Sequence, residues 1–118
     1  MQILPFGQRG GIKMLYDVRQ RPQAVYLQGR VFVGFKGGAS PSHSGKPNTS
    51  PRLISYDPAS RSFSETLTLS RATGDHHHGP VVWADKEEHL HVLFGCHKTP
   101  GTHLVAKRPA DMGRDLSD

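Results

Sequence analysis

The chain has 118 residues, enough for one small domain, and its hydrophobic content of 35% with 13 glycines and 9 prolines favours short strands and turns over long helices. The net charge of +5 favours an anionic partner, but the lysines and arginines are scattered, so nucleic-acid binding is not indicated. The sequence contains no run of about 18 apolar residues, so no membrane span is predicted. Its single cysteine excludes a disulfide framework within the chain.

A first group of four strands is predicted within residues 21–70, after a loop or single strand in residues 1–20. The dipeptide Gln28-Gly29 is predicted to make a tight turn between the first two strands. A long, polar, exposed loop is predicted for residues 39–51. The strands are expected at residues 23–27, 30–36, 52–57 and 62–70.

A second group follows in residues 71–118, and its polar tail stops before the pattern of a fourth strand is complete. Strands are expected at residues 80–85, 89–95 and 102–107. Cys96 sits in an apolar, strand-like run, so it is predicted to be a small buried hydrophobic residue.

The two groups repeat one order of elements. "RPQAVYLQGRVFVGF" and "GPVVWADKEEHLHVLF" both have a proline, an apolar strand, a turn and a second strand ending in phenylalanine. Four strands in a unit of this length are typical of a β-propeller blade. A β-sandwich whose hairpins look alike by chance is the alternative. We therefore predict an all-β fold, a β-propeller fragment of about two four-stranded antiparallel blades, over 21–70 and, incompletely, 71–118. Because blades bury their faces by stacking, we expect the chain to be part of a larger protein.

A family likeness rests on the segment "DHHHGPVVWADKEEHLHVLFGCH" and the preceding "RPQAVYLQGRVFVGFKG…RLISYDPASRSFSE". Both resemble BNR-repeat (sialidase-like) propeller proteins, and most closely the ulvan-lyase-type polysaccharide lyases. The resemblance implies a full-length protein of seven blades, an acidic polysaccharide or other glycan as partner, and a secreted or periplasmic location, although no signal peptide is recognisable. "SYDPASRSF" is also similar to the structural Asp-box turn, with Asp57 as its acid and a poor match elsewhere.

The resemblance also suggests site residues. The family motif Asp-Asp-His-Asn-x-Pro, matched on Pro80, puts its histidine on His77, while its acids fall on Asp75 and His76 and its asparagine on His78. The histidine that closes the next strand falls on His97. The resemblance implies that His77 and His97 line the substrate cleft, and that a tyrosine and an arginine come from later blades.

Strand geometry brings the same two residues together independently. If the two strands between them pair antiparallel, the start of one lies beside the end of the other, so His77 and His97 approach one rim. Histidine suits acid or base chemistry near neutral pH, as β-elimination from a uronate requires.

Other histidines have plainer interpretations. In an extended segment His76 and His78 point away from His77, as loop or packing residues. His89 and His91 share a strand face and are expected to be solvent-facing. No metal or cofactor is predicted, although a metal held by His77, His97 and a third histidine such as His103 stays open. Arg21 is either a surface residue or a contact for an anionic sugar.

Three functions remain open. The first is a polysaccharide lyase that cleaves an acidic polysaccharide by β-elimination, with the isolated chain expected to be inactive. The second is a non-catalytic propeller that binds glycans or is structural. The third is a sialidase-like glycoside hydrolase, although the arginine cluster it requires is not evident. No nucleic-acid or membrane partner is predicted.

Overall fold

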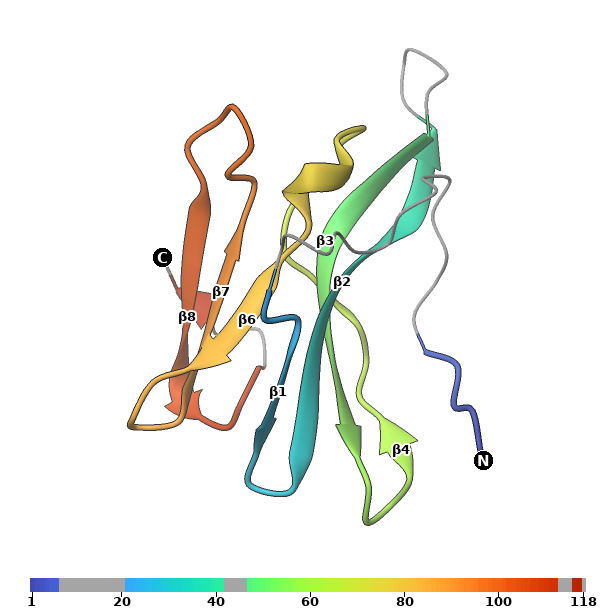
Figure 1. Ribbon diagram of the computed structural model, residues 1–118, viewed down its shortest axis with the longest axis vertical. Helices are drawn as coiled ribbons and strands as arrows, with labels where there is room; N and C mark the ends of the chain where they lie inside the picture. The colour runs from blue at the N-terminus through green and yellow to red at the C-terminus, as the bar shows by residue number, and fades with distance from the viewer. Residues whose placement is uncertain (7–20, 42–46, 113–115, 118) are drawn as a thin grey trace.

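The protein folds into two antiparallel β-sheets (Figure 1). The structure, a computed structural model, describes residues 1–6, 21–41, 47–112 and 116–117. These residues contain strands and one 3-10 turn, and no α-helix is found among them. The all-β prediction is confirmed, and the two sheets are arranged as two neighbouring blades of a β-propeller.

The first sheet has the strand order β1-β2-β3-β4, with β5 also paired to β3. Its strands are β1 (Ala24–Leu27), β2 (Arg30–Pro41), β3 (Pro47–Asp57), β4 (Ser62–Phe63) and β5 (Leu67–Thr68). The second sheet has the order β6-β7-β8-β9. Its strands are β6 (Val81–Ala84), β7 (His89–Phe94), β8 (Thr102–Pro109) and β9 (Leu116–Ser117). The last strand of the first sheet ends at Thr68 and the first strand of the second begins at Val81. The division of the chain into two units at residue 70 stays a prediction.

The predicted tight turn between the first two strands is present. Gln28 has φ 47° and Gly29 φ 82°, and two successive positive φ angles are what a two-residue type I′ hairpin requires. Leu27 pairs with Arg30 across the turn. The hairpin register is therefore set at the bottom of the first sheet.

The predicted long loop at residues 39–51 is largely wrong. The register of β2 and β3 continues through Ser40 opposite Asn48 and Pro41 opposite Pro47, after an irregularity between Gly37 and Ser40. Backbone pairing does not need apolar side chains, so a polar composition did not prevent the strands from extending. Residues 42–46 lie outside the described residues.

The predicted fourth strand, residues 62–70, is divided into β4 and β5. The hydroxyl of Ser64 accepts a hydrogen bond from the backbone N–H of Ser55 and donates to the carbonyl of Glu65. A side chain thus takes the place of a backbone acceptor and interrupts the ladder. Pairing resumes at Leu67 opposite Leu53.

The turn before β4 resembles an Asp-box in one respect. The Asp57 carboxylate accepts hydrogen bonds from the backbone N–H groups of Ala59 and Ser60. The aspartate therefore fixes this turn as expected.

Cys96 is exposed, so the prediction of a buried cysteine is wrong. β7 ends at Phe94, and Gly95 follows with φ 76°. This left-handed residue turns the chain out of the sheet before Cys96 is reached.

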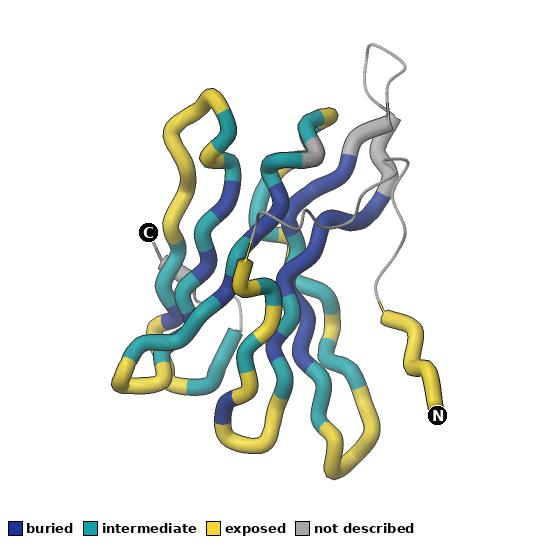
Figure 2. The backbone as a smooth tube through the Cα atoms, in the orientation of Figure 1, coloured by how far each residue is buried: buried dark blue, intermediate teal, exposed yellow. Residues whose placement is uncertain are grey.

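The core lies between the two sheets (Figure 2). Fully buried side chains include Leu53 from the first sheet and Val82, Leu90 and Val92 from the second. The sheets lie close together at Gly34, where an added Cβ would lie 2.7 Å from a methyl group of Val82. The backbone N–H of Val82 also donates to the carbonyl of Pro22. Among the described residues, no helix is long and apolar enough to cross a membrane.

Candidate functional site

The three consecutive histidines form a 3-10 turn, η1 (His76–His78), at the entry to the second sheet. Asp75 caps the turn, since its Oδ1 accepts the backbone N–H of His77 at 2.9 Å. The prediction of an extended segment here is therefore wrong, and the orientations inferred from it do not hold. The side chain of His76 lies outside the described residues.

His78 has the packing role that was expected, for a different reason. Its Nε2 lies 3.0 Å from the backbone oxygen of His97, and its Nδ1 lies 3.3 Å from Oγ1 of Thr73. Its side chain is only 16% exposed. The half-buried His78 therefore connects η1 to the segment that follows β7.

His77 and His97 lie side by side, as the antiparallel pairing of β6 and β7 predicts. Val81 is paired with Leu93, so the residues just before β6 and just after β7 meet at one edge of the sheet. The two imidazole rings are 4.1 Å apart between centroids. Both are partly exposed, which leaves the pair accessible from solvent.

Asp75 joins the two rings. Its Oδ1 lies 2.8 Å from Nδ1 of His77, and its Oδ2 lies 2.8 Å from Nδ1 of His97. We call Asp75, His77 and His97 the bridged histidine cluster. When Nδ1 of each ring carries the proton and donates it to Asp75, the basic lone pair of each neutral ring is on Nε2.

The electrostatics of Asp75 favour this arrangement. Partial burial raises the pKa of its carboxyl group, but hydrogen bonds from His97 and from the backbone and ring of His77 lower it by more. The net pKa is well below its usual range, so the carboxylate is ionised at neutral pH. An ionised carboxylate holds both rings in the tautomer described above.

Lys36 contacts the cluster through the backbone of Asp75. It is fully buried on β2, and its Nζ donates to the backbone oxygen of Asp75 and to Oγ1 of Thr73. Burial lowers the pKa of Lys36 to about 8, against the attraction of Asp75, which raises it. Lys36 therefore fixes the position of the residue that bridges the histidines. Thr73 is held by reciprocal backbone bonds to Thr49 on β3.

The bridged histidine cluster could hold a metal ion. Each residue offers one ligand atom, and these atoms lie within 4.8 Å of one another; imidazole nitrogen with carboxylate oxygen is a donor set that zinc uses. The third member is Asp75, whereas His103 contacts Trp83 and His91. Since the carboxylate already satisfies both rings, the observed geometry does not require an ion.

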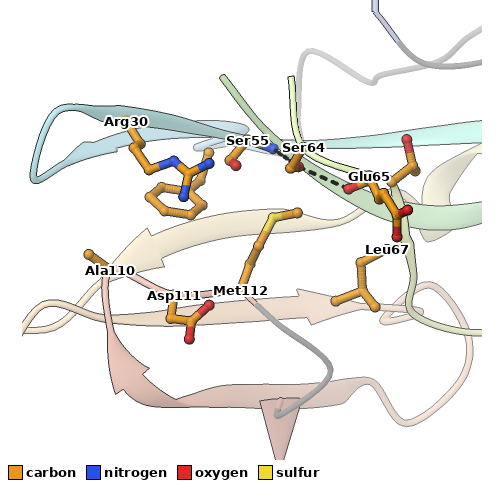
Figure 3. A pocket seen from close by; sticks show the side chains of 10 residues that line it. Arg30, Ser55, Ser64, Glu65, Leu67, Ala110, Asp111 and Met112 are labelled. Atoms are coloured by element: carbon orange, nitrogen blue, oxygen red, sulfur yellow. Dashed lines mark hydrogen bonds between the residues drawn. The ribbon is translucent and has the colours of Figure 1, made fainter. Parts of the chain in front are cut away.

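A cavity of about 530 Å³ opens between the two sheets, away from the histidines (Figure 3). Arg30 and Asp111 lie on its opposite walls, and Met112 lies between the sheets. Its other lining residues are Phe32, Ser55, Ser64, Glu65, Thr66, Leu67 and Ala110. It contains no residue of the bridged histidine cluster, so we do not assign the candidate site to it.

Sequence reasoning did not predict the roles of Asp75 and Lys36. Asp75 was matched only to a family acid, although an aspartate directly before a helical turn is a common cap. A lysine within an apolar strand gave a weak signal, because lysine is rarely buried unless it is paired. Arg21 is exposed, and its contact with an anionic sugar stays a prediction.

The fold of the chain is similar to one found in solved polysaccharide lyases. Two solved structures are similar to this chain over 92% of its length. The first is an ulvan lyase described as a new polysaccharide lyase family, PL25, with a TM-score of 0.68 and 17% identity. The second is an ulvan lyase of the same family bound to -[GlcA(1-4)Rha3S]-, with a TM-score of 0.67 and 17% identity.

The likeness is one of fold. The chain spans 28% of the length of each ulvan lyase. No protein-family model and no curated protein sequence matches it. Membership of the BNR-repeat family thus remains a prediction.

Proposed function

We propose that the bridged histidine cluster binds an acidic polysaccharide and supplies part of the site of a lyase that acts by β-elimination. The observation that carries the proposal is the pair of imidazole rings, 4.1 Å apart and joined by one carboxylate, on a fold shared with ulvan lyases. One of those lyases is bound to a glycan that contains glucuronate.

The chemistry suits imidazole. In β-elimination a base removes the proton beside the uronate carboxylate, a carbon–carbon double bond forms, and the glycosidic oxygen leaves with a proton. A neutral ring whose Nδ1–H donates to Asp75 has a basic Nε2 that can take a proton or bind a sugar hydroxyl. Asp75 would then stabilise the imidazolium that forms, since its carboxylate stays ionised.

Glycan binding without cleavage is the second candidate. A lyase also needs an acid for the leaving oxygen and a cation for the uronate carboxylate. Of the tyrosines that the structure describes, Tyr26 is exposed on β1, and the ring of Tyr56 is tilted by 42° against that of Phe63. Both are paired with Val31, five residues along β2 from Lys36, so binding is the function that the described residues support by themselves.

The test uses a sulfated oligosaccharide that contains glucuronate. Calorimetric titration should show binding to the wild-type chain, and His77→Asn should weaken it at least about tenfold, or 1.4 kcal/mol. The exposed His103 offers a matched control, and His103→Asn should bind like the wild type. Equal affinity in the His77 variant would refute the assignment.

The same samples separate the two candidates. A rise in ultraviolet absorbance from an unsaturated uronate would identify a lyase. Because the isolated chain is expected to be inactive, the absorbance assay is repeated on a longer protein that contains it, where binding with no such rise would identify a glycan-binding protein.

A further inference from the structure

The outer face of the second sheet carries a separate group of polar and aromatic side chains. Along β7, Leu90, Val92 and Phe94 are buried, so His89, His91 and Leu93 alternate with them on the opposite face. On that face Trp83 is paired with His91, and Leu93 with His103. We call His91 and His103 the outer-face histidine pair.

The rings of this pair meet through their nitrogens. Nδ1 of His91 lies 2.9 Å from Nε2 of His103, and the ring planes are 25° apart. The other nitrogen of His91, Nε2, lies 3.0 Å from Oδ2 of Asp85. The two nitrogens of neighbouring strands thus face each other across a hydrogen bond, and a carboxylate lies behind one of them.

Asp85 sets the tautomer of His91. The carboxylate of Asp85 lies 3.0 Å from Nε2 of His91 and accepts hydrogen bonds from the backbone N–H groups of Glu87 and His89. An ionised carboxylate accepts Nε2–H, which leaves a lone pair on Nδ1 of His91 directed at His103. This carboxylate–histidine arrangement is the usual support behind a metal-ligating imidazole, because it orients the ring and makes it more basic.

We propose that the outer-face histidine pair binds a divalent transition-metal ion that favours imidazole, through Nδ1 of His91 and Nε2 of His103. With metal–nitrogen bonds of about 2.0–2.1 Å, two tetrahedral ligands stand about 3.3 Å apart. Ion binding therefore requires the 2.9 Å hydrogen bond to break and both rings to turn until their nitrogens point at the ion. On binding, the proton on Nε2 of His103 moves to its Nδ1, and water completes the coordination. Zinc, nickel and copper all accept imidazole ligands.

The chain contains a local reporter for this site. Trp83 is its only tryptophan, and its ring centroid lies 5.1 Å from that of His91 and 5.3 Å from that of His103. Nickel bound between the two histidines would quench the fluorescence of Trp83. Nickel also avoids the reduction that copper would undergo at the exposed Cys96.

The experiment titrates the whole chain with Ni²⁺ and follows Trp83 fluorescence. We expect saturable quenching, weakened at least about tenfold in His103→Asn, a substitution that an exposed site tolerates. Asp85→Asn should weaken it about 10- to 100-fold. The amide nitrogen would then donate to Nε2 of His91 and move the ring proton to Nδ1, which imidazole nitrogen NMR detects in the same variant.

Two control variants complete the design. His89→Asn removes a neighbouring histidine whose Nδ1 is bonded to the carbonyl of Ala106, and it should leave the quenching unchanged. His97→Asn removes a member of the bridged histidine cluster and should also leave the quenching of Trp83 fluorescence unchanged. Wild-type quenching in both His103→Asn and Asp85→Asn, or loss of quenching in His97→Asn, would overturn the proposal.

Discussion

Asp75 and His97 are joined by a hydrogen bond of 2.8 Å between Oδ2 and Nδ1, although 22 positions separate them in the chain. The contact connects the cap of η1 to the segment that follows β7. It makes the position of His97 depend on the turn that carries His77. The two histidines therefore form one unit.

Replacing Asp75 should loosen this unit and change the acid stability of the protein. The pKa of the carboxyl group is lowered in the folded chain, so its contribution to stability is present above the unfolded pKa of about 3.9 and is lost as the pH falls towards the folded value. Asp75→Asn should reduce the free energy of unfolding by about 2 kcal/mol at pH 7. Denaturant titrations between pH 7 and 2 should show this difference shrinking as the pH falls.

Asp111 provides the matched control, because its ion pair with Arg108 lies on the surface and such pairs contribute little. Asp111→Asn should follow the wild-type curve. A constant difference between wild type and Asp75→Asn over the whole range would contradict the proposed charge on Asp75.

Lys36 should leave a signature at high pH. Its pKa is lowered from 10.5 to about 8, so between these values the unfolded chain binds more protons than the folded one, and stability rises with pH. Lys36→Met should remove this rise. Unfolding measured from pH 7.5 to 10.5 tests the prediction, and Lys86→Met, at an exposed lysine, should retain the rise. If stability rises with pH as steeply in Lys36→Met as in the wild type, the lowered pKa of Lys36 is not the cause of the rise.

Gly34→Ala should separate the two sheets. The added Cβ would lie 2.7 Å from a methyl group of Val82 and 3.1 Å from the ring of Pro80. Relieving this overlap requires backbone movement, with a loss of about 1–3 kcal/mol. Thermal unfolding of Gly34→Ala, Val82→Ala and the double variant forms a cycle. The double variant should be more stable than the sum of the single losses predicts, and strict additivity would exclude a direct clash.

The strand pattern of the core could be read from the sequence. Val82, Leu90 and Val92 alternate with less buried residues and lie where periodicity places them. The positions where strands end were harder to predict from the sequence than the core pattern. Proline, glycine and serine in residues 39–51 predicted a loop, because composition does not reveal backbone pairing between β2 and β3.

The candidate site could be predicted only in part. The antiparallel pairing of β6 and β7 brought His77 and His97 together as expected. The conformation of η1 depended on one local hydrogen bond from the backbone of His77 to Asp75, which an alternating pattern does not show. His89 and His91 were expected to face solvent, yet both are half-buried and hydrogen-bonded, since their neighbours on the face are histidine, tryptophan and valine.

The most direct test of the central claim is an NMR titration of the imidazole signals with a sulfated oligosaccharide that contains glucuronate. The bridged histidine cluster predicts that the signals of His77 and His97 shift together with one dissociation constant. Asp75→Asn should weaken both responses equally. Binding of the oligosaccharide with no change in either histidine, or with two different constants, would contradict the account.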